Sequence, residues 1–272
     1  MLIFETLADR LNSPRGLSFD GQGTLYIAEA GRGGGGKGPS LSSPNQPGAV
    51  LDYGPTGSIA RWQGGQLDRP WQGLPSLAKA DGSDAAGLHD LAIADDGTLY
   101  GLFGFASNPA NRDPSVVCGC AVPQTAADLA ASQLVIDRTI GVPDFGQLVR
   151  FDSKATNPKP SDAKTATWTK LVDLVSFEAA NNPNGDDLNT NPFKFLLQGN
   201  EVTFIDSGAN VALRSQLDGS GLRAWAKFPA RNVASPFPTG DRSLSMQSVP
   251  TSLALGADGA FYVSELLSLI HI

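Results

Sequence analysis

The chain of 272 residues has few of the residue types that build metal centres and disulfide frameworks, with two cysteines and two histidines. Cys118 and Cys120 are separated by one residue, so alone they cannot supply the four ligands of a tetrahedral zinc site. Three interpretations stay open: a strained disulfide, half of a metal site, or a pair of loop thiols. None of them identifies the cellular compartment.

The sequence also lacks runs of lysine and arginine and long apolar segments. It has 20 basic and 27 acidic residues and a net charge of −7, which weighs against nucleic acid or an anionic membrane as partner. No stretch approaches the roughly 18 apolar residues of a membrane-spanning helix. Residues 1–10 lack the basic and apolar regions of a secretion signal.

Glycine and proline are abundant, at 31 and 19 residues, and 41% of the chain is hydrophobic. Many glycines and prolines are expected where many short strands need turns. The hydrophobic content is sufficient for a sizeable core. The length fits one all-β domain, since such architectures often reach it undivided.

A hairpin motif recurs four times along the chain. Each copy is a short strand of alternating apolar residues, a tight turn, and a second β-rich strand. The copies are Ser13–Glu29, Gly87–Gly101, Asn191–Asp206 and Val249–Glu265. A repeated hairpin of this kind is typical of β-propeller blades.

Three copies are followed by two further strands that complete a four-stranded blade. We expect these strands at Gly57–Trp62 and Gln66–Leu74, Gly146–Asp152 and Ala166–Leu174, and Asn210–Gln216 and Leu222–Phe228. The fourth copy has only its first hairpin. Ile3–Leu11 is similar to the outermost strands and is expected to close the ring. The sequence therefore predicts an all-β, incomplete, NHL-like propeller of roughly six blades, with a closing strand, three blades and half of a fourth.

Three long insertions separate the strands. Gly31–Tyr53 is expected to be a loop, Ala106–Asp144 to contain a short helix at Ala126–Gln133, and Glu178–Asn191 is dense in Asn, Asp and Gly. Such loops usually carry the function of a rigid scaffold. Asn181–Asp187 has the composition of a calcium loop without the ligand spacing of an EF-hand.

The last six residues, Leu267–Ile272, can be encoded by CTG-TCT-CTT-ATA-CAC-ATC, which matches a transposase adapter used in sequencing libraries. We expect residues 1–266 to be a partial propeller domain and residues 267–272 to be a non-native tail. A natural apolar tail is the alternative. Met1 is then expected to lie inside a longer reading frame that carries a signal peptide, which would place the full-length protein outside the cell or in the periplasm.

Segments in the same order along nearly the whole chain resemble the ScyD/ScyE family, NHL-like propellers named after scytonemin-pigment gene clusters. The segments are Pro14–Phe19, Leu25–Gly33, Tyr53–Ile59, Gly73–Leu77, His89–Asp90, Phe145–Leu148, Phe177–Pro183, Asn191–Pro192 and Gln247–Ser252. The resemblance implies further blades after Val263–Leu266. It implies little chemistry, because the activity of the family is poorly defined.

Alignment of the four hairpins places Arg15, His89, Phe193 and Thr251 at one position and Asp90 at the next. These residues begin the innermost strands, so we expect Arg15, His89, Asp90 and Thr251 to bind ligand at the mouth of the central channel. His89 is a candidate general base. A hydrogen-bonded structural imidazole is the alternative, since neighbouring residues on a strand point to opposite faces.

Carboxylates recur at the ends of the second strands, at Glu29, Asp206 and Glu265. If they converge on the propeller axis, they form a site for a divalent cation such as calcium, assisted by Asn210. The alternative is that they cap turns or pair with arginines such as Arg32. No cofactor is certain from the sequence.

Two functions follow from these patterns. The first is a non-catalytic binding or scaffold protein that takes a small molecule or a protein partner. The second is a metal-assisted lactonase, hydrolase or lyase acting at the central channel through the axial carboxylates and His89. No phosphate-binding loop or Ser-His-Asp order is present.

Overall fold

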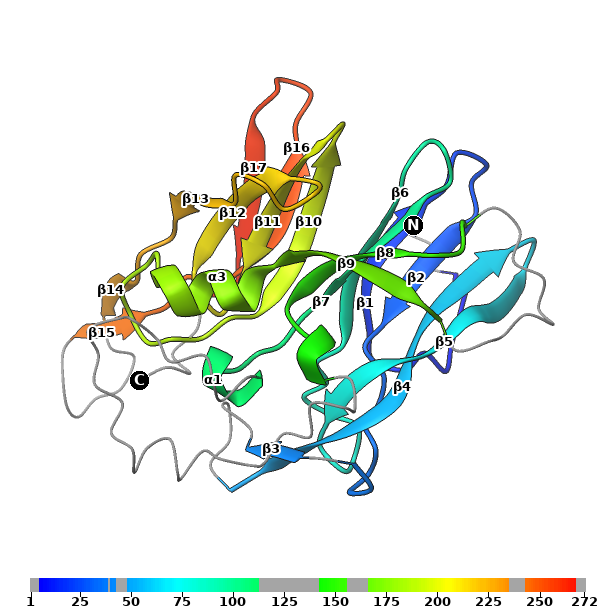
Figure 1. The fold of residues 1–272 in the computed structure, drawn as a ribbon, viewed down its shortest axis with the longest axis horizontal. Coiled ribbons are helices and arrows are strands. Elements are labelled where there is room, and N and C mark those ends of the chain that lie inside the picture. The colour runs from blue at the N-terminus through cyan, green and yellow to red at the C-terminus, as the bar shows by residue number, and fades with distance from the viewer. Residues whose placement is uncertain are drawn as a thin grey trace.

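The computed structural model describes residues 5–38, 40–42, 48–112, 142–155, 166–234 and 243–267. These residues form antiparallel sheets, so the fold is mostly β as predicted (Figure 1). The cysteines, the predicted helix at 126–133 and residues 268–272 of the predicted tail lie outside the described residues.

The first sheet runs through β1 (Pro14–Phe19), β2 (Leu25–Glu29), β4 (Val50–Gln63) and β5 (Gln66–Ala78), and the short strand β3 (Ser40–Ser42) pairs with the start of β4. The predicted order is confirmed, but the last two strands are longer than predicted. The expected loop at 31–53 is wrong in part, because β3 and β4 pair within it. Buried Leu41, Leu51 and Tyr53 pack together there and favour strand over loop.

Two further sheets have four antiparallel strands each in sequence order, as the repeat predicts. The second sheet contains β6 (Leu88–Ile93), β7 (Leu99–Phe103), β8 (Gln147–Phe151) and β9 (Trp168–Asp173). The third contains β10 (Pro192–Gln198), β11 (Glu201–Asp206), β12 (Val211–Gln216) and β13 (Arg223–Lys227). Two hairpins follow, β14 (Arg231–Ala234) with β15 (Ser243–Met246) and β16 (Pro250–Leu255) with β17 (Phe261–Glu265). The β16–β17 hairpin forms at the fourth copy of the repeat, as predicted, and the β14–β15 hairpin was not predicted.

Helical segments are few among the described residues: α1 (Pro109–Arg112), the 3-10 turn η1 (Val142–Asp144) and α3 (Leu174–Asn181). The sequence analysis missed α3. Asp173 caps its first turn by accepting a hydrogen bond from the Ser176 amide, and Asn182 ends it in the left-handed region at φ 35°. In the described ranges no helix is long and apolar enough to span a lipid bilayer.

The predicted closing strand at Ile3–Leu11 is wrong for its described part. Residues 5–11 form no strand. A strand forms only where a neighbouring edge supplies hydrogen-bond partners. Instead, Leu11 packs beside Leu25, Ile27 and Ala60 on the outer face of the first sheet.

The sheets pack face to face through apolar layers. Tyr26, Ile59 and Trp71 of the first sheet pack against Leu88 and Phe103 of the second. Tyr100 and Leu148 of the second sheet share a core with Phe195 and Phe204 of the third, and Ile205 of the third packs against Leu253 of the last hairpin. The first strands of successive sheets, β1, β6, β10 and β16, therefore lie next to one another in that order.

The two ends of the strands carry different connections. The tight hairpin turns lie at one end and point upward in Figure 1, whereas β3, α1, α3 and the β14–β15 hairpin lie toward the other end. The described parts of the connections from second to third strands and from one sheet to the next lie at this second end. The described parts of the predicted insertions therefore lie on one side of the sheets, and such connections often carry the function of a rigid scaffold.

Replacement of Phe103 by alanine tests the first apolar layer. The ring is fully buried between the first two sheets, so we expect Phe103→Ala to lower the free energy of unfolding by about 3–5 kcal/mol. Phe19→Ala is the matched control, because that ring is 64% exposed and its loss should change stability by less than about 0.5 kcal/mol. Denaturant unfolding followed by circular dichroism measures both, and equal effects would contradict the assigned packing.

Candidate functional site

Each first strand has an irregular register near its start. The irregularities fall between Pro14 and Leu17, Leu88 and Asp90, Pro192 and Lys194, and Pro250 and Ser252. The four residues that the alignment equated, Arg15, His89, Phe193 and Thr251, sit inside these bulges. A bulge redirects the side chain that it contains, so these four side chains do not follow the regular alternation of their strands.

Three of the four bulge residues come together. Arg15 Nη2 donates a 2.7 Å hydrogen bond to the Ala85 carbonyl, and the Arg15 charge contributes to lowering the pKa of His89. The rings of His89 and Phe193 lie 5.1 Å apart. Thr251 is separate and pairs with Ser264 in its own hairpin, with 3.2 Å between the hydroxyl oxygens.

His89 is 3% exposed, and Gly104 packs directly against its ring. Its Nδ1 lies 3.1 Å from the Pro192 carbonyl, which only accepts, so Nδ1 carries the proton. Burial, followed by the charge of Arg15, lowers the pKa of His89 to about 3. A neutral imidazole enclosed in this way has the properties of the structural alternative rather than those of a general base that meets a substrate.

Asp90 on β6 contacts the first strands on either side of it, β10 and β1. It forms a 2.8 Å ion pair with Lys194 and accepts a 3.1 Å hydrogen bond from the Phe195 amide. Gly16 lies so close that an added Cβ would approach Asp90 Oδ1 to 2.2 Å. Burial raises the pKa of Asp90, and the charge of Lys194 opposes this shift. Asp90 therefore joins neighbouring first strands, and its role at the mouth of a channel stays a prediction.

The recurring carboxylates share one local role. Glu29 accepts a 2.7 Å hydrogen bond from the Asn12 amide, and Asp206 accepts one of the same length from the Asn191 amide. Glu265 accepts a 2.8 Å hydrogen bond from the hydroxyl of Ser248. Each carboxylate thus holds the segment just ahead of its own first strand. We call this contact the strand-end clasp.

The structure does not bring the three carboxylates together into the predicted axial ring. Glu29 is paired with Arg69, not with Arg32, and Glu265 is paired with Arg231. In the part of the chain that the structure describes, no three His, Cys, Asp or Glu side chains are grouped so that they could hold a metal ion. The physical reason is local: each carboxylate turns into its own sheet, where amides and hydroxyls need acceptors.

Asn210 also has a structural connection. It adopts φ 53° in the turn between β11 and β12. Its amide donates to Gln247 Oε1 at 2.9 Å, and its carbonyl oxygen accepts from the Val249 amide at 2.8 Å. The third sheet is thereby tied to the start of the last hairpin.

Asn210 borders a polar cavity of about 250 Å³ at the end of the molecule that carries the long connections. The cavity is lined by Gly185, Asp186, Asp187, Asn189, Gly208, Asn210 and Gln247. We call it the Asp186 pocket. All of its lining residues are acidic, amide-bearing or glycine, so it presents oxygen acceptors and amide donors to a ligand.

The Asn- and Asp-rich segment after α3 forms one wall of this pocket. The Asn182 side-chain amide donates to the Asp186 carbonyl at 2.8 Å, and the Gly185 amide donates to the Asn182 carbonyl at 3.0 Å. The Asn184 side-chain amide donates to Asp186 Oδ2 at 2.6 Å. Short side chains that bond to nearby backbone are the reason that this composition forms a compact turn.

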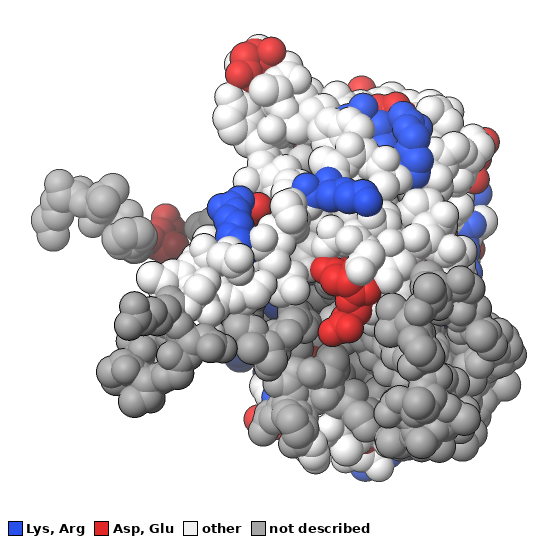
Figure 2. Space-filling model, turned by 90° about the vertical axis from the view of Figure 1, so that its left-hand side faces the viewer, with Lys and Arg blue, Asp and Glu red and all other residues white. Residues whose placement is uncertain are grey.

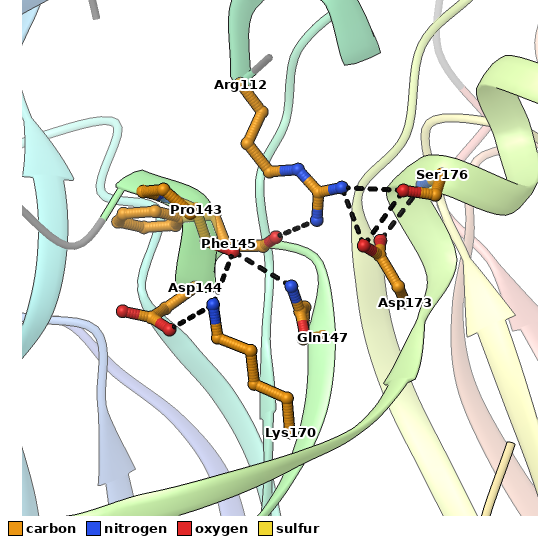
Figure 3. A network of polar contacts seen from close by, with 8 residues as sticks. All are labelled: Arg112, Pro143, Asp144, Phe145, Gln147, Lys170, Asp173 and Ser176. Atoms are coloured by element: carbon orange, nitrogen blue, oxygen red, sulfur yellow. Dashed lines mark hydrogen bonds and ion pairs between the residues drawn. The ribbon is translucent and has the colours of Figure 1, made fainter. Parts of the chain in front are cut away.

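A buried arginine holds α3 in place. Figure 3 shows Arg112 donating to the Phe145 carbonyl at 3.0 Å, to Asp173 at 2.8 Å and to Ser176 at 3.0 Å. Asp173 is also the cap of α3. Because this network fixes the start of the helix, it fixes the position of Glu178 one turn further on.

Glu178 is 1% exposed, and neither of its carboxyl oxygens has a hydrogen-bond partner among the described residues. Burial raises the pKa of Glu178 to about 8, and the charges of Asp206 and Asp186 contribute to this rise. Asn189 Oδ1 is likewise buried without a partner in this part of the chain. The sequence analysis missed Glu178, because nothing in its helical segment distinguishes it. The dense Asn and Asp composition of the next residues was the available signal.

The face drawn in Figure 2 carries small separate groups of basic and acidic side chains, without a continuous basic field among its described residues. This distribution agrees with the absence of lysine and arginine runs in the sequence.

Comparison with known proteins gives only distant likenesses. No protein-family model and no curated protein sequence matches the chain. The PQQ-bound aldose sugar dehydrogenase of Streptomyces coelicolor is similar, with TM-score 0.46, 15% identity, 97% of this chain covered and 59% of that chain. A protein described as a putative oxidoreductase (glucose dehydrogenase) from a Thermus species gives TM-score 0.30, 16% identity, and coverage of 95% and 92%. The chain thus spans 59% of the length of the first structure, and neither likeness carries a conclusion about its chemistry.

The buried His89 predicts a specific dependence of stability on pH. Its pKa is about 3 when folded against 6.5 ordinarily, so between these values the unfolded chain binds more protons. The contribution of His89 to the free energy of unfolding is therefore at its maximum above pH 6.5, and it is lost as the pH falls toward 3. Between about pH 7 and about pH 4.5, the titration of His89 should lower the free energy of unfolding by an amount on the order of 2 kcal/mol. We expect this part of the pH dependence to be absent in His89→Gln. Chemical denaturation at both pH values measures it, and an unchanged pH dependence would contradict the enclosed neutral imidazole.

The strand-end clasp predicts that Glu29 stabilises the fold without a metal. Glu29 is 0% exposed and binds Asn12, Ser58 and Arg69. We expect Glu29→Gln to lower the free energy of unfolding by about 1–3 kcal/mol, because charge-assisted hydrogen bonds are lost. The loss should be the same with and without a chelator, measured by denaturant unfolding. A loss that disappears when EDTA is present would favour the axial metal site instead.

Proposed function

We propose that this chain is part of a β-propeller that acts as a binding protein and takes a small polar ligand in the Asp186 pocket. The proposal includes the interpretation of the repeats as those of a ScyD/ScyE-like, NHL-like propeller. It also includes a full-length protein that is extracellular or periplasmic. The single observation that carries the binding role is the pocket itself. Acidic and amide groups from the segment after α3, from the β11–β12 turn and from Gln247 line one cavity.

The propeller part of the proposal is supported by the way successive sheets stack. The first, second and third sheets and the β16–β17 hairpin pack one on the next, and their first strands lie side by side in sequence order. The two faces that no described sheet covers carry exposed apolar side chains, Leu17 and Phe19 on β1 and Tyr262 on the last hairpin. In a ring of blades, such faces are covered by further sheets.

Binding is favoured over hydrolysis at the channel because the residues that the sequence analysis proposed for catalysis and metal binding are already engaged in structural contacts. His89 is enclosed and neutral, Asp90 is paired with Lys194, and the strand-end carboxylates clasp backbone. A metal-assisted hydrolase at the channel needs a base in contact with its substrate. The enclosure of His89 gives that alternative no support.

The pocket is tested with a library of small polar compounds screened by thermal shift on the full chain. We expect compounds that raise the melting temperature of the wild type to lose most of that shift in Asp187→Asn and Gln247→Ala, since both residues line the cavity. Asp9→Asn is the matched control, because this carboxylate lies far from the pocket in sequence and is 71% exposed. Compounds that raise the melting temperature equally in the wild type and in all variants would contradict the assignment of the pocket as the binding site.

A parallel assay separates binding from catalysis. Hydrolysis of a lactone and of a 4-nitrophenyl ester is followed with the wild type and with His89→Gln. We expect no turnover that depends on His89. Turnover that is lost in this variant, while the circular dichroism spectrum is retained, would replace the binding proposal with the hydrolase.

A further inference from the structure

We propose that Glu178 keeps its proton in the folded protein and that loss of this proton loosens α3 and the segment that follows it. Glu178 is thus a pH-sensitive switch built into the fold. The inference goes beyond the proposed function, because it concerns the stability of one part of the structure and needs no ligand. The segment after α3 supplies one wall of the Asp186 pocket, so the switch acts on that wall.

Glu178 lies on the buried face of a short helix. The buried residues of α3 are Leu174, Val175, Glu178 and Ala179, and residues four apart share one face of a helix. Leu174 and Val175 belong to two apolar cores between the elements. The same face therefore carries a carboxyl group into the interior, where Glu178 is 1% exposed.

The surroundings offer Glu178 no donor. Among the described residues neither of its carboxyl oxygens has a hydrogen-bond partner, and no lysine or arginine forms an ion pair with it. An ionised carboxylate can only accept hydrogen bonds. Ionised Glu178 would therefore be a buried charge with neither of its oxygens satisfied, and the neutral acid avoids that cost.

A second buried carboxyl group, Asp206 at the end of β11, acts on Glu178 through its charge. Asp206 accepts four hydrogen bonds, from the amides of Asn191, Gly208 and Ala209 and from the hydroxyl of Thr190. Burial raises the pKa of Asp206, and these four hydrogen bonds oppose the rise. Hydrogen bonds to a carboxylate favour its ionised form, so of the two acids Glu178 is the one that keeps a proton.

The other charged groups around α3 leave this assignment unchanged. Asp186, from the segment after the helix, contributes a further negative charge. Arg112 of α1 is bound at the start of α3, and Arg150 of β8 is exposed. Burial, followed by the charges of Asp206 and Asp186, raises the pKa of Glu178 from 4.5 to about 8.

Loss of the proton lowers stability as the pH rises. Between pH 4.5 and about pH 8 the folded chain binds more protons at Glu178 than the unfolded chain does. The free energy of unfolding therefore falls as the pH rises through this window. A helix of eight residues has little stability of its own, so α3 and the segment after it open more readily than the packed sheets.

The experiment compares the full chain with Glu178→Gln, whose side chain imitates the neutral acid in shape and charge. Thermal unfolding is followed from about pH 6 to about pH 9. We expect the melting temperature of the wild type to fall relative to that of the variant as the pH rises, by roughly 3 °C or more over this range. Glu201→Gln is the matched control, because this partly exposed carboxylate pairs with Arg214 on the third sheet and its loss should leave the pH profile of the wild type unchanged.

Amide hydrogen exchange locates the opening. At about pH 9, α3 and residues 182–189 should exchange on the order of tenfold faster in the wild type than in Glu178→Gln, whereas β7 and β11 should exchange alike. Parallel melting profiles of wild type and variant would overturn the proposal, as would equal exchange in α3.

Infrared spectroscopy tests the proton directly, even if Glu178→Gln does not fold. We expect the wild type at neutral pH to show the carbonyl band of a neutral carboxylic acid, and this band should weaken as the pH is raised to about 9. Absence of the band at neutral pH overturns the proposal. Ligand-dependent thermal shifts that need Asp187 and Gln247 would still support the proposed function, so the two proposals fail separately.

Discussion

Apolar contact between the faces of successive sheets is the interaction on which the rest of the structure depends. The side chains of Tyr26 and Ile59 meet Leu88 and Phe103, and the same arrangement recurs one sheet further along with Tyr100 and Phe204. A single antiparallel sheet cannot bury both of its faces alone, so each sheet gains most of its stability from its neighbours. This stacking also fixes the strand ends, and with them the side of the molecule on which the long connections gather.

The strand-end clasp shows how a structural repeat can imitate an active site in sequence. Glu29, Asp206 and Glu265 recur at equivalent positions because each closes its own hairpin onto the preceding segment. Such a contact satisfies buried polar groups that would otherwise lack acceptors. The second sheet has Phe103 at this place and uses apolar packing instead. The repetition of acidic residues therefore reflects repeated folding requirements.

The Asp186 pocket differs from these contacts because its walls come from connections and not from strand ends. The Arg112 network and the Asp173 cap hold α3, which leads into the Asn- and Asp-rich segment that forms one wall. The β11–β12 turn supplies the opposite wall through Gly208 and Asn210. Two connections that are separate in sequence thus form one pocket, and the proposed binding of a small polar ligand follows from the acidic and amide side chains that line it.

The sequence by itself determined the hairpin repeat, the two four-stranded sheets, four of the five strands of the first sheet and the last hairpin, because strand alternation and turn residues act over a few neighbouring positions. It did not determine α3, the strand β3 or the absence of a strand in residues 5–11, since each depends on a cap or an edge supplied from elsewhere in the fold. The same limit applies to the site. Composition pointed to the segment around Asp186, but only the tertiary structure decided that His89 is enclosed, that Glu29 pairs with Arg69, and that Glu178 is buried without a partner among the described residues. These are outcomes of contacts between distant segments, which no local pattern encodes.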